Sequence, residues 1–127
     1  MIFRFDPRQG LVIVPTRLWG PSGDTVARLA LDTGATRSVV SAAILVGVGY
    51  DPATIHGRVR ISTASGVEFA AALPVEKIEA LGLVRTPFLI LCHTLPPSTS
   101  VDGLLGLDFL RSCQLAIDFR EGVLSIR

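Results

Sequence analysis

The sequence contains few residues of the kinds that bind metal ions or form disulfide bonds. Among its 127 residues are two cysteines, Cys92 and Cys113, and two histidines, His56 and His93. No second cysteine pair is present to complete a metal site, so we expect neither a metal nor another cofactor. We interpret both cysteines as small buried hydrophobic residues. A cysteine nucleophile served by His93 is disfavoured, because adjacent strand residues point to opposite faces.

The sequence also lacks an excess of one charge and a long hydrophobic run. Its 12 basic and 11 acidic residues give a formal net charge of +1, without a basic cluster, which argues against nucleic-acid binding. The longest apolar stretches, residues 41–50 and 88–92, fall short of the roughly 20 residues that span a bilayer, so we expect no membrane insertion. The first residues do not resemble a secretion signal, and we therefore expect a cytoplasmic protein.

Apolar residues are abundant for so short a chain. They make up 49% of the sequence, whereas charged residues make up 18%. A chain of this length supports one domain with its own core, and we predict a single domain over residues 1–127. The high apolar content predicts that part of the surface contacts another subunit or a peptide.

The most informative motif is Asp32-Thr33-Gly34-Ala35, which follows an apolar strand. Alternation places Ala27, Leu29 and Leu31 on one face of that strand, so the chain reaches Asp32 as it leaves a hydrophobic layer. An ionised aspartate is costly in such a place unless it is paired. Gly34 permits a close backbone approach, and the Thr33 hydroxyl can orient neighbours by hydrogen bonding. The motif therefore predicts a site that presents one carboxylate.

The rest of the sequence alternates between short strand patterns and turn signals. We predict a hairpin leading to Asp32, a short strand over 37–40 and a helix begun by Ser41 and ended by Gly47 and Gly49. A second hairpin follows, then two strands between 74 and 91, a short helix over 107–113 and a last hairpin. Its final strand, 123–127, would lie at a sheet edge, where a second copy of the chain could cover it. The predicted hairpin arms are 11–14 with 25–31, 58–61 with 67–70, and 114–119 with 123–127.

Two segments together resemble the retropepsin-like aspartic proteases. One is Asp32-Thr33-Gly34-Ala35, and the other is the stretch 101–110, which contains Leu104-Leu105-Gly106. Order, spacing and flanking apolarity make this combination more specific than a lone Asp-Thr-Gly. The resemblance covers about residues 10–127 and implies an all-β, single-lobe barrel with one or two short helices.

The resemblance also implies roles for individual residues. Asp32 resembles the catalytic carboxylate, and the Thr33 hydroxyl resembles the group that braces two active-site loops against each other. Gly34 and Ala35 resemble the backbone that faces substrate. The tip of the hairpin around residues 63–66 resembles the flap over bound peptide, which makes Ala64, Ser65 and Gly66 further candidates for substrate contact. The two leucines of 104–106 are interpreted as core residues beneath the loop.

A chain with one such aspartate can form a carboxylate pair only with a second copy. We therefore predict a homodimeric aspartic endopeptidase that acts on a peptide or protein substrate. One alternative is a peptide-binding or dimerisation module that kept the fold and lost hydrolysis. Another is a protease restricted to itself or to one partner protein.

The sequence departs from the retroviral pattern beside both motifs. Retroviral enzymes pair an acid after Asp-Thr-Gly-Ala with an arginine after the late glycine, but this sequence has Thr36 and Leu107 there. Arg37 and Asp108 lie one residue further on, so we predict a pair of reversed polarity, with two solvated charges as the alternative. The departure favours a cellular or bacterial relative over a retroviral enzyme.

Overall fold

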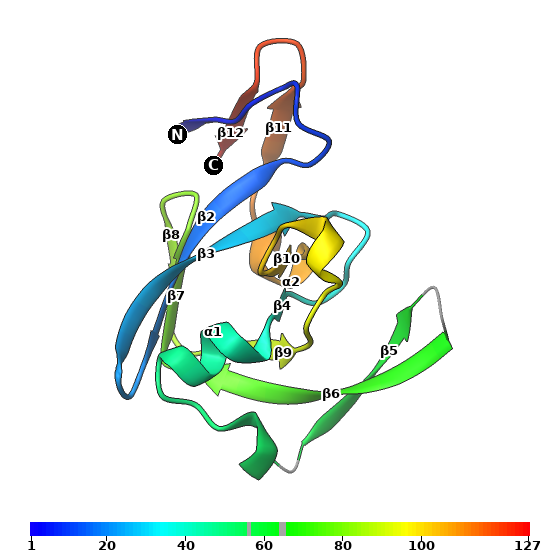
Figure 1. Cartoon of the computed structure of the whole chain (residues 1–127). Coiled ribbons are helices and arrows are strands. Elements are labelled where there is room, and N and C mark those ends of the chain that lie inside the picture. Colours follow the sequence, from blue (N-terminus) through cyan, green and yellow to red (C-terminus); the bar gives the residue numbers. More distant parts are fainter. Residues whose placement is uncertain (56, 64–65) are drawn as a thin grey trace.

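The structure is a computed structural model that describes residues 1–55, 57–63 and 66–127. Most of these residues form strands, and the larger sheet curls around the core (Figure 1). This sheet has nine strands in the order β5-β6-β9-β4-β10-β3-β2-β7-β8. Their bounds are β2 (Ile13–Gly20), β3 (Gly23–Leu31), β4 (Val39–Val40), β5 (Arg58–Thr63), β6 (Gly66–Val75), β7 (Lys77–Ala80), β8 (Leu83–Arg85), β9 (Phe88–Cys92) and β10 (Gly103–Leu105).

A smaller sheet joins the two ends of the chain. It contains β1 (Ile2–Arg4), β12 (Val123–Ile126) and β11 (Leu115–Asp118), in that order. β12 is therefore the central strand, with antiparallel partners on both sides. The prediction that the last strand lies at an edge is wrong, because β1 covers it within the same chain. The edges of this sheet are β1 and β11 instead.

The centre of the large sheet is the short strand β10. It runs parallel to β3, with Leu105 beside Leu31, and antiparallel to β4. A Cβ atom on Gly103 would overlap the Val39 carbonyl oxygen, so only glycine fits where β10 pairs with β4. This arrangement brings the end of β3 and the end of β10 together, which is where Asp32 begins its loop.

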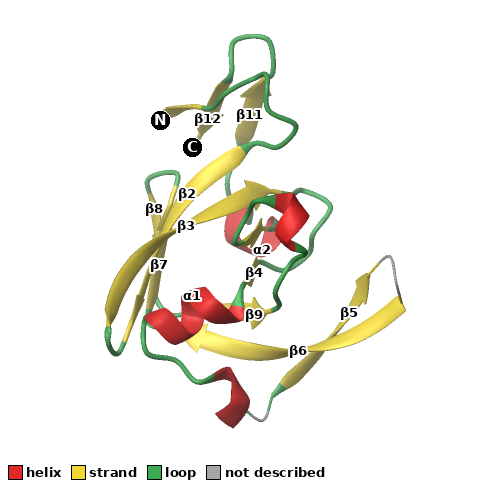
Figure 2. Ribbon diagram, in the orientation of Figure 1, coloured by secondary structure: helices red, strands yellow, loops and turns green. Residues whose placement is uncertain are grey.

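Two short α-helices cover parts of the sheet (Figure 2). The helix α1 (Ala42–Gly47) begins where the Ser41 hydroxyl accepts a hydrogen bond from the Ile44 amide, and Gly49 follows with a φ of +102°. The helix α2 (Leu107–Leu110) follows β10 directly. Two single 3₁₀ turns, at Pro52–Thr54 and Pro97–Thr99, complete the helical structure of the described residues.

The core lies between the curled sheet, α2 and the small sheet. Alternate residues of β2 and β3 point into it, among them Leu18 and Leu29, which are fully buried. Phe109 from α2 and Leu124 from β12 join the same cluster. The helix α2 and both sheets thus share one hydrophobic interior.

The predicted all-β architecture with one or two short helices is confirmed. Two details differ from the prediction. Residues 74–91 contribute β7, β8 and β9 besides the end of β6, instead of two strands. The second helix ends at Leu110, because Arg111 leaves the helical conformation, so Cys113 lies beyond it.

Candidate active site

The Asp32 loop is held at both ends by the segment from β10 to α2. The Asp32 amide donates to the Leu105 carbonyl oxygen over 2.9 Å, and the Leu107 amide donates to the Ala35 carbonyl oxygen over 2.9 Å. Within the loop, the Ala35 amide donates to the Asp32 carbonyl oxygen over 3.2 Å. These backbone bonds fix where the loop begins and where it turns back, so the loop that carries the Asp32 side chain is anchored to the end of β10 and to the start of α2.

The Asp32 carboxylate is partly buried and has one internal partner. Its Oδ1 atom accepts a hydrogen bond from the Gly34 amide over 2.9 Å. Its Oδ2 atom has no hydrogen-bond partner within the described part of the chain, and no basic side chain there lies within ion-pair distance. A Cβ atom on Gly34 would lie 3.2 Å from Oδ1, which is a tight contact. The loop therefore presents one free carboxylate oxygen.

A buried serine and an aspartate connect the loop to α2. The Ser38 side chain is fully buried, and its hydroxyl donates to Asp108 Oδ1 over 2.7 Å. The Ser38 amide donates to Asp108 Oδ2 over 2.9 Å, and the Gly106 amide donates to the Ser38 hydroxyl over 2.9 Å. Sequence reasoning missed this pair. Its only local sign is the position of Ser38 beside two apolar strand residues, where a hydroxyl needs a buried partner.

The predicted ion pair between Arg37 and Asp108 is wrong. Both residues are described, and no ion pair forms between them. Arg37 is exposed, whereas Asp108 uses both oxygens on Ser38 and also accepts from the Phe109 amide. The neutral serine takes the place that the arginine was expected to fill, because it reaches Asp108 from inside the fold.

The packing role predicted for residues 104–106 fits their surroundings. Leu105 is fully buried in the main core, and Leu104 packs against a second small cluster formed by Val39, Ala70 and Leu91. A Cβ atom on Gly106 would lie 2.8 Å from the Ala35 carbonyl oxygen. The close approach between this glycine and the Asp32 loop therefore requires the absence of a side chain.

A cavity of about 470 Å³ lies beside the Asp32 loop. Gly34 and Ala35 line one wall, and Val59 and Ile61 of β5 line another. The structure thus brings these two predicted substrate-facing residues to a cavity next to Asp32. Thr33 is exposed, and its hydroxyl has no hydrogen-bond partner in the described residues. Of the predicted hairpin tip, Ala64 and Ser65 lie outside the described residues, and Gly66 begins β6 with a φ of +128° without lining this cavity.

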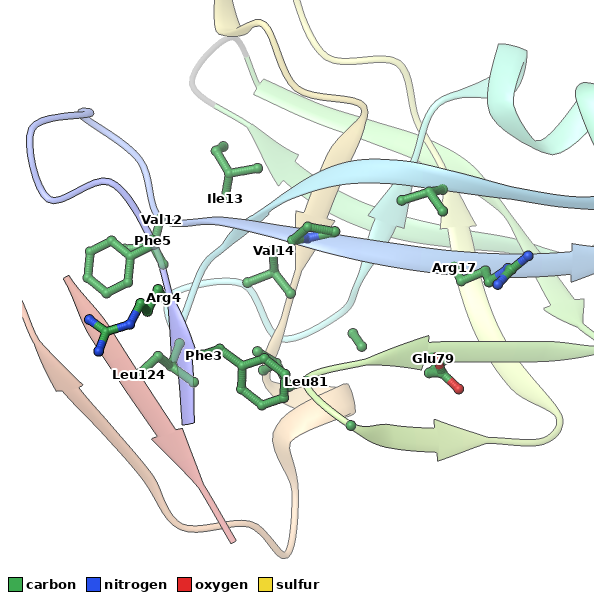
Figure 3. A pocket seen from close by; sticks show the side chains of 14 residues that line it. Phe3, Arg4, Phe5, Val12, Ile13, Val14, Arg17, Glu79, Leu81 and Leu124 are labelled. Atoms are coloured by element: carbon green, nitrogen blue, oxygen red, sulfur yellow. The ribbon is translucent and has the colours of Figure 1, made fainter. Parts of the chain in front are cut away.

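Another cavity, of about 420 Å³, lies away from the predicted site (Figure 3). Phe3, Phe5 and Leu124 form its apolar wall on the side of the small sheet, and Val14 and Leu81 face them. None of the predicted site residues that the structure describes lines it. We assign no chemistry to it, because the charged groups at its rim, from Arg4, Arg17 and Glu79, have no common orientation toward a ligand.

Neither cysteine occupies a reactive setting. Both are partly buried free thiols that pack against the core, and burial raises the pKa of the Cys92 thiol above its ordinary value. Within the described ranges, no three His, Cys, Asp or Glu side chains gather as metal ligands would. None of the helices in these ranges has the length and hydropathy of a membrane-spanning segment.

Comparisons with known proteins agree with this geometry. An aspartyl protease family model matches residues 15–109, which include the Asp32 loop, β10 and the start of α2. The chain therefore belongs to the aspartyl protease family. No curated protein matches the sequence significantly.

Solved structures of retropepsin-like proteins share the fold. A retropepsin-like aspartic protease from Rickettsia conorii superposes with a TM-score of 0.71 at 18% identity, over 98% of this chain and 86% of that one. The retroviral protease-like domain of Ddi1 from Leishmania major gives 0.57 at 17% identity, over 94% and 90%. The EIAV protease in complex with the inhibitor HBY-793 gives 0.54 at 25% identity, over 82% and 86%. The fold is thus retropepsin-like, as the sequence resemblance implied.

Proposed function

We propose that the protein is an aspartic endopeptidase whose active site forms from two copies of the chain, with Asp32 of each copy as the catalytic residue. The observation that carries this proposal is the free Oδ2 atom of a partly buried carboxylate, held in a loop that is fixed from both sides. A second carboxyl group that shares a proton with Asp32 would supply a partner for this oxygen.

The chain offers no second aspartate in a similar loop. Asp32 stands in the only Asp-Thr-Gly sequence, so the partner has to come from another copy. The Thr33 hydroxyl is exposed and has no partner in the described residues, and in the dimer it would brace the two loops against each other. The edges of the small sheet, β1 and β11, offer backbone groups for further pairing between the copies.

The chemistry follows from two close carboxyl groups. Like charges about 3 Å apart do not both ionise readily, so one group keeps its proton at a pH where the other is ionised, as aspartic proteases in general exemplify. The ionised group takes a proton from water, and the water oxygen attacks the peptide carbonyl carbon. The protonated group donates its proton to the carbonyl oxygen. When the C–N bond breaks, the leaving nitrogen takes the proton that the first group received from water, and the second group takes back a proton from a hydroxyl of the tetrahedral intermediate, which restores the starting pair. The two apparent pKa values belong to the pair and not to either Asp32.

The cavity beside the loop is suited to an extended peptide. A peptide that lies between the Asp32 loop and the hairpin β5–β6 would pass Gly34 and Ala35. Gly34 has no side chain and Ala35 has only a methyl group, so both leave room for a strand. Main-chain hydrogen bonds would supply much of the affinity, and the apolar walls of Val59 and Ile61 would accept side chains.

The test is the substitution Asp32→Asn, which keeps the shape of the side chain and removes its charge. We expect it to abolish cleavage of an unfolded protein substrate while the far-ultraviolet circular dichroism spectrum stays unchanged. Asp24→Asn is the matched control, because Asp24 lies in the β2–β3 hairpin and pairs only with Arg17 at the surface. That variant should retain full activity.

Mixing experiments separate a dimeric site from a site within one chain. An excess of the Asp32→Asn variant should suppress wild-type activity, because mixed dimers carry only one carboxyl group. Activity should be highest in acid, since one of the two groups must keep its proton. Full activity in the Asp32→Asn variant, or a rate that keeps rising above neutral pH, would contradict the proposal. A monomer without cleavage at any pH would favour a peptide-binding module with the same fold.

A further inference from the structure

The cavity beside the Asp32 loop is lined by apolar residues and by two arginines. Its apolar lining residues are buried or partly buried: Val39, Val59, Ile61, Leu91 and Leu104. Its charged lining residues within the described part of the chain are Arg37 and Arg60, and no acidic residue lines it. The cavity therefore combines two positive charges with space for an aliphatic side chain.

Within the described part of the chain, no ion pair neutralises either guanidinium. Arg37 and Arg60 are exposed, and neither forms an ion pair or a side-chain hydrogen bond with a described residue. Two acidic side chains on neighbouring elements, one on α2 and one on β6, already have other partners. Asp108 is bound by Ser38, and Glu68 lies 3.6 Å from the imidazole of His93.

The two arginines reach the cavity from different elements. Arg37 follows the Asp32 loop directly, so its backbone is fixed by the contact of Gly106 with residues 35–37. Arg60 belongs to β5, which is the outermost strand of the large sheet, and it lines the cavity together with its neighbours Val59 and Ile61. A peptide lying between the loop and β5 would therefore pass both charges.

We infer that this cavity selects peptides that carry an aspartate or glutamate side chain close to an aliphatic residue. The inference rests on the proposed function, because it takes the cavity as part of the substrate-binding cleft. The carboxylate would pair with the guanidinium groups, whose planar fork of N–H donors suits a carboxylate. The aliphatic side chain would contact the apolar lining of the cavity. A lysine at the same position of the peptide would be repelled by both arginines.

The experiment compares three peptides that differ in one residue. Each has the same aliphatic pair at its centre and either Glu, Gln or Lys at one flanking position, and the set is repeated for each flanking position. Cleavage is followed as kcat/KM with the wild-type protein, and binding is followed by fluorescence anisotropy with the uncleaving Asp32→Asn variant. At pH 6 and low salt, we expect about a 2-fold to 5-fold preference for Glu over Gln at one position or more, the range that exposed ion pairs give.

Two physical controls distinguish a charge contact from a shape preference. The preference should shrink as ionic strength rises, because salt screens charges at the surface. It should also disappear as the pH falls from about 5 to about 3, because the peptide glutamate becomes protonated and then resembles glutamine. A preference that survives both changes would overturn the inference.

Charge reversal identifies the residues. Arg37→Glu and Arg60→Glu should each lower the preference for Glu, and the double variant should favour the Lys peptide. Arg120→Glu is the matched control, since Arg120 lies in the exposed turn between β11 and β12, far from β5 (Figure 1). It should leave the preference unchanged.

The outcomes separate the two proposals. Cleavage of the Glu and Gln peptides at equal rates overturns the inference and leaves the proposed function intact. Absence of cleavage overturns the proposed function, and the binding measurement then still decides the inference. Equal binding of the three peptides, or no binding of any of them, overturns the inference.

Discussion

The substitution Ser38→Ala should destabilise the protein far more than its small change in volume implies. The Ser38 hydroxyl is fully buried and connects Asp108 to the Gly106 amide through bonds of 2.7 and 2.9 Å. Alanine removes both bonds. The Gly106 amide then has no partner in a buried place, and one Asp108 oxygen loses its shorter bond.

The magnitude follows from these two losses. A hydrogen bond to a charged group contributes about 1.5–3 kcal/mol, and a buried donor without a partner costs about 1–3 kcal/mol. We expect Ser38→Ala to lower the free energy of unfolding by about 3 kcal/mol, since the Ser38 amide still holds the other Asp108 oxygen. For a chain of this length, that loss corresponds to a Tm lower by about 10 °C.

Urea unfolding, followed by the fluorescence of the single tryptophan, Trp19, measures the change. Ser41→Ala is the matched control. Its hydroxyl accepts one bond of 3.4 Å at the start of α1, so its loss should cost about 1 kcal/mol or less. Equal stabilities of the Ser38→Ala and Ser41→Ala variants would refute the reasoning, because they would mean that the buried bridge contributes no more than an ordinary helix cap.

Two further predictions concern packing and pH. Gly103→Ala should destabilise by about 3 kcal/mol or prevent folding, since its Cβ atom would overlap the Val39 carbonyl oxygen. Gly10→Ala, which has no atom within 4 Å of the added carbon, should stay within about 0.5 kcal/mol of the wild type in the same urea titration. Burial raises the pKa of the single tyrosine, Tyr50, above its ordinary value, and the hydrogen bond from the Glu76 amide offsets part of this rise. Ultraviolet absorbance should therefore show Tyr50 ionising at higher pH in the folded protein than in urea, and stability should fall as the pH rises above about 10. Equal ionisation midpoints of Tyr50 in the folded protein and in urea would disprove this prediction.

The parts of the fold that depend on local sequence could be predicted. The Asp32 loop, the Ser41 cap of α1 and the hairpin of β5 with β6 have signals within a few residues of themselves. The hairpin of β7 with β8 was missed, and its turn explains why. Leu81 and Gly82 both have positive φ, but leucine rarely adopts this conformation, so the pair does not carry the usual sequence signal.

The remaining features depend on residues that are far apart in the sequence. The strand β1 has three residues, which is too few for an alternating pattern, and its partner β12 lies at the other end of the chain. The bond between Ser38 and Asp108 joins positions 70 apart. No pattern near Ser38 or Asp108 identifies the other, whereas the charges of Arg37 and Asp108 suggested a wrong pair. Long-range pairing is set by the packing of the whole core, which a single sequence does not display.

The most direct test of a shared active site is a crystal structure of the protein, in which the two Asp32 side chains nearest to each other are located. We expect a twofold dimer in which the carboxyl oxygens of the two Asp32 side chains lie about 3 Å apart, close enough to share one proton. A monomer, or a dimer in which the two Asp32 side chains point away from each other, would contradict it.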